Sequence, residues 1–239
     1  MPTTRETREP LYALELDGTE PLSATAVKAV GGLCDRAEDR AGTRTEGGPP
    51  GPAGRSAVAF RVSGAPADGW STGLDVMLVT KWERALRRLE RLPLVTVAVA
   101  RGDCGGTALE TFLAADVRVA APGTRLLLPR GATAPWPGMA AYRLVRLAGT
   151  ARIRRAVLFG HPIEAAEALA FGVVDELTDD PAAVVAATAG LAGTVPGKEV
   201  AIRRQLMFDA ATTGFEDALG AHLAACDRAL RQGAEEEAR

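Results

Sequence analysis

The chain has 239 residues, of which 47% are hydrophobic and 24% are charged. This length and balance are those of a globular protein with a substantial core, built as one large domain or two small ones. The net charge of −2 offers no attraction for nucleic acid or an anionic membrane surface, and no apolar run approaches the ~20 residues of a membrane-spanning helix.

Cysteine usage and the N-terminal composition indicate where the protein works. The first ten residues combine arginines with glutamates and hold no apolar segment, which argues against a signal peptide. Cys34, Cys104 and Cys226 lie far apart, as in proteins of a reducing compartment without a disulfide framework. No cysteines and histidines are spaced like metal ligands. We therefore expect a cytoplasmic protein with no metal ion and no other cofactor.

Strands and helices alternate through the first 92 residues. In order, the sequence predicts a strand over residues 11–17, a helix from Ser23 to about Arg40, a mobile glycine- and proline-rich loop over 42–54, a strand over 56–62 and a helix from Leu74 or Asp75 to Leu92. In the last of these, Val79, Trp82, Leu86 and Leu89 share one face, which predicts that this face is buried.

The central stretch of the chain has the strongest pattern. The unbroken apolar run Val95–Ala100 is typical of a strand that is buried on both faces. A glycine turn over residues 102–106 and a helix over 107–115 are expected to follow, with Asp116 closing the helix. Two further short strands are predicted over residues 117–120 and 125–128.

This strand–turn–helix unit predicts a site for an oxygen atom that develops negative charge. The turn and the helix N-terminus direct backbone N–H groups and a positive dipole end towards one place. Glu110 follows near the first turn of the same helix and adds a carboxylate. The helix dipole alone would also favour a carboxylate there, but the combination indicates a site that activates a carbonyl group.

The second half of the chain is mainly helical. Helices are predicted from Pro137 to about Leu147, from Ala151 to Phe159, over residues 163–171 and through most of 181–232, with one strand over 173–177. On the final helix, an apolar stripe indicates either core or a subunit contact; it consists of Phe215, Leu219, Leu223, Cys226 and Leu230. We expect an α/β core over residues 1–180 with parallel strands and a helical region over 181–239.

Four segments carry a resemblance to a known family. They are the loop Trp70–Asp75 (WSTGLD), the unit Gly102–Asp116, the turn Thr133–Leu144 (TAPWPGMAAYRL) and the segment Phe159–Leu177 (FGHPIEAAEALAFGVVDEL). In this order they resemble the crotonase, or enoyl-CoA hydratase/isomerase, superfamily over about residues 11–231. The last segment is the most specific of the four matches.

The resemblance implies a crotonase-like spiral of ββα turns, a C-terminal helical trimerisation region and a homotrimer or hexamer. It also implies an acyl-CoA thioester substrate, with coenzyme A entering as part of the substrate. The thioester oxygen would lie between two backbone N–H groups, which by position belong to Leu74 and Thr107, with Gly106 as the alternative for the second. Asp68, Trp70 and Thr72 lie in the region implied to bind the substrate.

The carboxylates of this chain depart from the family pattern. Hydratases of the family use two glutamates, of which the first corresponds to Glu110. The second should directly follow Pro129, but this chain has Arg130 there. A guanidinium stays protonated and is no general acid or base near neutral pH. We therefore expect enolate chemistry with one base, or a substrate whose carboxylate or extra oxygen binds Arg130.

A narrower resemblance is to the accessory crotonase-like proteins of 3,5-dihydroxyphenylglycine biosynthesis, which are encoded beside a polyketide synthase in antibiotic clusters. It implies help in the cyclisation and dehydration of a polyketide thioester to 3,5-dihydroxyphenylacetyl-CoA. The missing second glutamate leaves another interpretation open, in which the protein is a non-catalytic partner of the synthase.

A third interpretation concerns Cys104. Residues 102–106 also fit the pattern G-x-C-x-G of a nucleophile elbow after a buried strand, and Asp175 and His222 follow in the chain order of an α/β-hydrolase. A thiol at a helix N-terminus would have a lowered pKa. We keep this hydrolase as a distant alternative, because no HGGG-type segment precedes the strand.

Overall fold

The structure, a computed structural model, describes residues 12–42, 57–131, 133–195 and 197–237. Its strands are β1 (Leu14–Asp17), β2 (Ala57–Gly64), β3 (Val95–Gly105), β4 (Val117–Ala120), β5 (Arg125–Leu127), β6 (Ile163–Glu164) and β7 (Glu176–Leu177). Its helices are α1 (Ala24–Gly42), α2 (Val76–Leu89), α3 (Gly106–Leu113), α4 (Met139–Ala148), α5 (Thr150–Phe159), α6 (Ala165–Ala170), α7 (Pro181–Gly193), α8 (Gly197–Ala210) and α9 (Phe215–Glu237).

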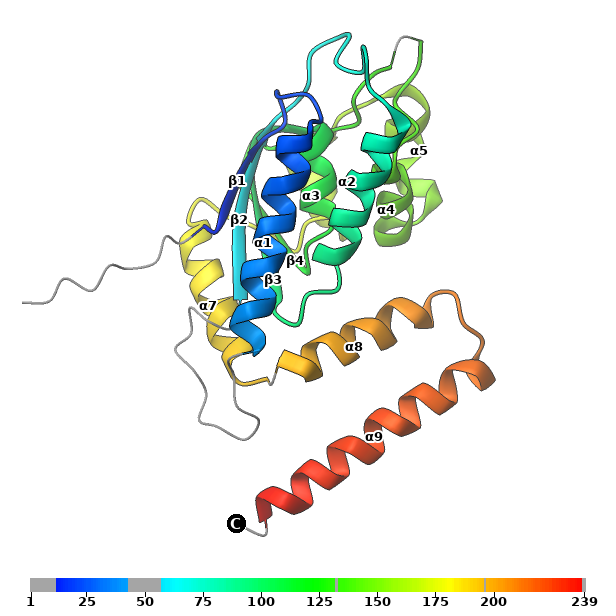
Figure 1. The fold of residues 1–239 in the computed structure, drawn as a ribbon. Coiled ribbons are helices and arrows are strands. Elements are labelled where there is room, and N and C mark those ends of the chain that lie inside the picture. Colours follow the sequence, from blue (N-terminus) through cyan, green and yellow to red (C-terminus); the bar gives the residue numbers. More distant parts are fainter. Residues whose placement is uncertain (1–11, 43–56, 132, 196, 238–239) are drawn as a thin grey trace, which may run out of the picture.

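One sheet organises the fold, with strand order β1-β2-β3-β4-β7 and all neighbours on this path parallel. Helices α1, α2 and α3 cover one face, and α7 covers the other (Figure 1). Strand β3 is buried on both faces, because Ala98 and Ala100 join the main core whereas Val97 and Val99 pack with Val185 of α7. The predicted α/β class with parallel strands is confirmed.

Strand β3 is longer than the sequence suggested, and this shapes the site. It pairs with β4 up to Ala100 and then with β5 from Asp103 to Gly105. The glycine turn predicted over residues 102–106 is therefore wrong in large part, because β5 supplies pairing partners that continue the strand. Within residues 102–106, only Gly102 and Gly106 have a positive φ, at 66° and 53°.

Two smaller predictions also differ from the structure. Ile163 and Glu164, which were expected to begin a helix, form β6 against β5, and the helix starts at Ala165. The predicted strand over 173–177 is reduced to β7, although Val173 and Val174 are fully buried. The loop predicted over 42–54 lies outside the described residues, apart from Gly42, which ends α1.

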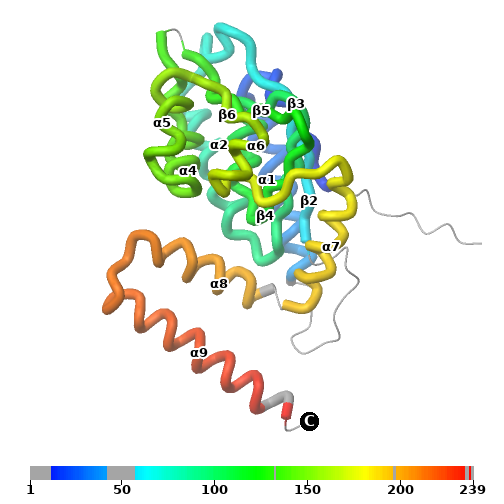
Figure 2. The backbone as a smooth tube through the Cα atoms, turned by 180° about the vertical axis from the view of Figure 1, so that it is seen from behind, coloured from blue at the N-terminus to red at the C-terminus, as the bar shows by residue number. Residues whose placement is uncertain are grey.

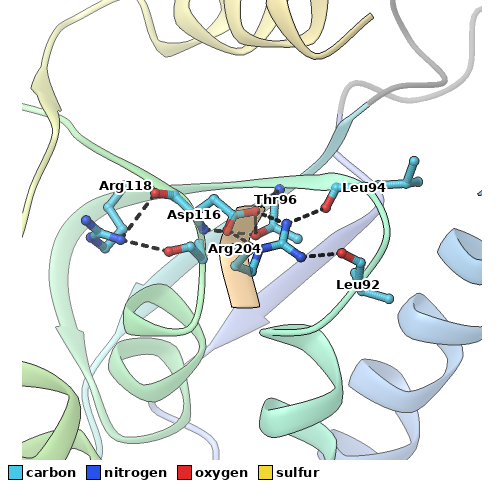
Figure 3. A network of polar contacts seen from close by, with 7 residues as sticks. Leu92, Leu94, Thr96, Asp116, Arg118 and Arg204 are labelled. Carbon is cyan, nitrogen blue, oxygen red and sulfur yellow. Dashed lines mark hydrogen bonds and ion pairs between the residues drawn. The ribbon is translucent and has the colours of Figure 1, made fainter. Parts of the chain in front are cut away.

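The C-terminal helices are joined to the sheet by a buried arginine. Arg204 of α8 donates from Nε to Asp116 Oδ1 at 2.6 Å (Figure 3). Its Nη2 donates to Asp116 Oδ2 at 2.5 Å and also to the Leu94 carbonyl at 2.9 Å. It also binds the Leu92 carbonyl, and Asp116 accepts two more hydrogen bonds from Thr96. This network, the Arg204 clamp, attaches α8 to the end of α3 and the start of β3.

Helix α9 extends beside α8 and away from the sheet, which both views show (Figure 1 and Figure 2). Its apolar stripe is exposed in the single chain, with Phe215 76% and Leu230 74% exposed. The interpretation of this stripe as core of the single chain is therefore wrong, and the subunit contact remains a prediction. No helix among the described residues combines the length and the apolar character that crossing a membrane requires.

Candidate functional site

A small pocket lies where the loop after β2, helices α2 and α3 and the loop after β5 meet. It is lined by Leu22, Trp70, Leu74, Val79, Trp82, Gly106, Thr107, Glu110, Pro129 and Trp136. All three tryptophans of the chain are in this set. The cavity is only about 10 Å³, which is room for one water molecule at most.

Glu110 is the carboxylate of this pocket, and it comes from the second turn of α3. The chain enters α3 through Gly105 and Gly106, where larger residues would not fit. Gly106 has a φ of 53°, and a Cβ on it would lie 3.1 Å from the ring of Pro66. These glycines let β3 continue directly into α3, so that the helix N-terminus and Glu110 border the same cavity.

One side chain holds Glu110 from the core side. Trp82 Nε1 donates to Glu110 Oε2 at 2.6 Å, and Trp82 itself is only 1% exposed. Removal from water and the negative charge of Glu83 raise the pKa of Glu110 to about 7, although the Trp82 hydrogen bond and Arg143 oppose this shift. A carboxyl group with such a pKa can both accept and return a proton near neutral pH.

A buried ion-pair group lies behind Glu110. Arg143 of α4 is 3.0 Å from Glu83 and 2.7 Å from Glu90, through Nη1 and Nε respectively. Burial raises the pKa of Glu83, and the nearby Arg143 counteracts this effect. Two carboxylates therefore share one guanidinium, and the charges of Glu83 and Arg143 both act on Glu110.

The two backbone N–H positions predicted to bind the thioester oxygen differ in whether they already have a hydrogen-bond acceptor. Gly106 and Thr107 are the first residues of α3, so their N–H groups have no carbonyl within the helix to bind. The N–H of Leu74, in contrast, donates to the Ser71 carbonyl at 3.0 Å. The structure thus brings Leu74, Gly106 and Thr107 to the same pocket as Glu110, but the Leu74 N–H already has an acceptor.

Two aromatic side chains form the outer wall of the pocket. Trp70 and Trp136 pack edge to face, with ring centroids 5.2 Å apart. Trp70 Nε1 also donates to the Arg130 carbonyl at 2.9 Å, which connects the loop after β2 to the loop after β5.

Arg130 does not line the pocket. Its side chain is exposed, and its Nη1 lies 4.0 Å from the position that a Cβ would take on Gly160, at the end of α5. Asp68 and Thr72 are also exposed and lie in the loop that carries Trp70, outside the pocket lining. The structure therefore brings together five of the eight predicted site residues and leaves these three at or beyond the rim.

The hydrolase alternative fails in the structure. Cys104 is fully buried within β3, and burial raises the pKa of its thiol instead of lowering it. Asp175 accepts hydrogen bonds from Arg118, and His222 is exposed on α9. No nucleophile–base–acid arrangement exists among these three residues.

Sequence reasoning missed four residues of the site region. The sequence patterns place Trp82 on a buried helix face and both Trp136 and Arg143 within one family motif, and they give no role to Glu83. Glu83 next to Trp82 in the sequence is only a weak indication of a role in the site. Its partner Arg143 lies 60 residues later, so the sequence does not show that the two side chains pair. Among the described residues, no group of three or more histidine, cysteine, aspartate or glutamate side chains could hold a metal ion.

Comparison with known proteins agrees with this geometry. The model of the family described as "Enoyl-CoA hydratase/isomerase" matches residues 71–237. A protein of Amycolatopsis orientalis named "Enoyl-CoA-hydratase" is 54% identical over 221 residues, which cover 92% of this chain and 96% of that protein.

Solved structures show the same fold at low identity. An enoyl-CoA hydratase/isomerase from Marinobacter aquaeolei has a TM-score of 0.72 at 15% identity, over 93% of this chain and 90% of its own. An enoyl-CoA hydratase from Shewanella pealeana has a TM-score of 0.71 at 15% identity, over 93% and 83% of the two chains. With its ordered motifs, its family match and its parallel sheet, this chain belongs to the enoyl-CoA hydratase/isomerase family, the crotonase superfamily.

Proposed function

We propose that this protein forms an enolate from an acyl-CoA thioester, with Glu110 as its single base. The observation that carries the proposal is the position of Glu110, in one pocket with the N-terminal amides of α3, which have no acceptor within the helix. Those amides would stabilise the negative charge on the thioester oxygen while Glu110 removes the α-proton. A pKa of about 7 suits this proton transfer near neutral pH.

A single carboxyl group also suffices for loss of water. Glu110 would take the proton from the α-carbon of a β-hydroxy thioester, leaving an enolate. The C–O bond at the β-carbon would then break, and the leaving hydroxide would take the proton back from Glu110 as water. Addition of water by two facing glutamates is disfavoured, because Arg130 replaces the second one and its side chain lies outside the pocket.

The acyl group that we propose is a polyketide thioester that cyclises and loses water to give 3,5-dihydroxyphenylacetyl-CoA. The indole rings of Trp70 and Trp136 at the pocket support this substrate, because planar unsaturated rings pack well against indole faces. We further propose that coenzyme A lies along the exposed loop with Asp68 and Thr72, that Arg130 binds an outer oxygen of the substrate, and that no other cofactor takes part.

A second candidate is a non-catalytic, crotonase-like partner of a polyketide synthase. Two observations favour it: the cavity beside Glu110 is only about 10 Å³, and the Leu74 N–H is occupied by the Ser71 carbonyl. In either role we propose a cytoplasmic homotrimer or hexamer, with the exposed stripe of α9 at a subunit contact.

The test combines binding with proton exchange. Acetyl-CoA and free CoA are titrated by calorimetry, and exchange at the acetyl α-carbon is then followed by NMR in deuterated water. We expect binding of acetyl-CoA and exchange that falls by about 10²- to 10⁴-fold in Glu110→Gln. Glu176→Gln, which removes an exposed carboxylate on β7, is the matched control and should exchange like the wild type.

Each other outcome has a defined meaning. Binding without exchange in the wild type would overturn the enolate proposal and favour the non-catalytic partner. If neither compound binds, the thioester substrate itself is wrong.

A further inference from the structure

The hydrogen bond from Trp82 engages one of the two oxygens of the Glu110 carboxylate. Trp82 is fixed by the main core, where it packs with Leu86 and Leu89 of the same helix. Its N–H is a donor only, and Glu110 Oε2 satisfies it at 2.6 Å. Since Oε2 is occupied, Oε1 remains to accept a proton, and it lies 3.0 Å from the position of a Cβ on Gly138, in the loop that carries Trp136.

The charges around Glu110 come from two helices and have opposite effects. Glu83 of α2 contributes negative charge and Arg143 of α4 contributes positive charge, and Arg143 also pairs with Glu90 at the end of α2. All three side chains are at most 20% exposed, so solvent screens them weakly. Without Arg143, an ionised Glu83 would oppose ionisation of Glu110.

We propose that Trp82 and the Arg143–Glu83 pair are positioning residues for Glu110. Trp82 holds one carboxylate oxygen so that the other faces the pocket, and Arg143 offsets the charge of Glu83 so that Glu110 can ionise. The proposal rests on the proposed role of Glu110 as the base, and it assigns a function to residues that do not themselves touch the substrate.

Changes at Trp82 and at Glu83 are expected to shift the pKa of Glu110 in opposite directions. Trp82→Phe removes a donor that favours the carboxylate, so the pKa of Glu110 rises. Glu83→Gln removes a neighbouring negative charge, so the pKa of Glu110 falls. A side chain that only fills space would produce neither a defined direction nor a difference in sign between the two variants.

The experiment uses the full chain without substrate. The protein is labelled with ¹³C at the glutamate carboxyl carbons, and the signal of Glu110 is assigned by its loss in Glu110→Gln. Its titration is followed by NMR from about pH 5 to about pH 9, a range that brackets a pKa near neutrality. We expect the midpoint to move up by about one pH unit in Trp82→Phe and down by about one in Glu83→Gln.

Arg84→Gln is the matched control, because Arg84 is an exposed charge on the same helix, and it should leave the midpoint in place. Shifts of the same sign in both variants, or no shift in Glu83→Gln, would overturn the proposal. If Trp82→Phe does not fold, as judged by circular dichroism, Glu83→Gln alone decides.

The same variants separate this proposal from the proposed function. With active wild-type protein, the pH profile of α-proton exchange should move with the NMR midpoint, and Trp82→Phe should also lower the plateau rate. Opposite NMR shifts without any exchange in the wild type would support the positioning of Glu110 and contradict its role as a base. Exchange in the wild type with an unmoved NMR midpoint would contradict the positioning proposal alone.

Discussion

Two carboxylates, one within α3 and one just after it, have opposite surroundings. Asp116, just after the helix, accepts hydrogen bonds from Arg204 with both oxygens and from the Thr96 N–H and hydroxyl at 2.9 Å each. Glu110, within the helix, accepts one hydrogen bond among the described residues, from Trp82. The first carboxylate is saturated with donors, and the second keeps one oxygen available.

This difference separates a structural carboxylate from a reactive one. Asp116, with its full set of donors, connects the elements around it. Glu110 has lost water without gaining a full set of donors, and its pKa rises to about 7 as a result. This short helix therefore presents an acid–base group from its second turn, and Asp116, which follows the helix, connects α8 to the sheet.

Breaking the Arg204 clamp should have the largest effect. Arg204→Met leaves the partly buried Asp116 without its cation and removes the donors to the Leu92 and Leu94 carbonyls. We expect the free energy of unfolding to fall by about 3–5 kcal/mol, measured by urea denaturation. Arg203→Met is the control, because that arginine is 63% exposed and pairs only within its helix, with Glu199, and it should cost less than about 1 kcal/mol. Equal losses in the two variants would contradict the role of the clamp.

The pH dependence of the free energy of unfolding tests the unusual environment of Glu110. Because the pKa of Glu110 is about 7 in the folded chain and 4.5 ordinarily, the folded state binds more protons between these values. Its contribution to the free energy of unfolding is therefore complete below pH 4.5 and is lost as pH rises to about 7.

In Glu110→Gln this loss is absent, so the variant should gain up to about 3 kcal/mol relative to the wild type across that window. Denaturation at several pH values between these limits checks the difference. A constant difference between variant and wild type would mean that Glu110 has an ordinary pKa in the folded state.

The smallest effect is expected at Cys104. Its side chain is fully buried beside Leu126 of the neighbouring strand and does not line the pocket. Cys104→Ala should therefore cost about 1 kcal/mol of stability through a small cavity and leave exchange activity nearly unchanged. Loss of activity at normal stability in this variant would bring the thiol back as a functional group.

Local patterns were sufficient for much of the fold. The apolar run Val95–Ala100 predicted a strand buried on both faces, and the predicted helix start at Leu74 or Asp75 agrees with α2, which Asp75 caps through its side chain. The predicted ends of helices and strands were wrong where a strand distant in the sequence supplies backbone hydrogen bonds. Residues 103–105 are strand because β5 pairs with them, and Ile163, which was expected in a helix, is strand because β6 pairs with β5.

The sequence by itself determined the parallel α/β core, the helical C-terminal part and the placement of Glu110 beside the N-terminal amides of α3. Those features depend on residues that are close in the chain, where apolar spacing, glycines and helix ends act directly. Only the tertiary structure decided the environment of that carboxylate. Trp82, Glu83 and Arg143 reach it from two other helices, and Arg130 turns away from it, because packing between distant segments sets which charges share a region of low dielectric.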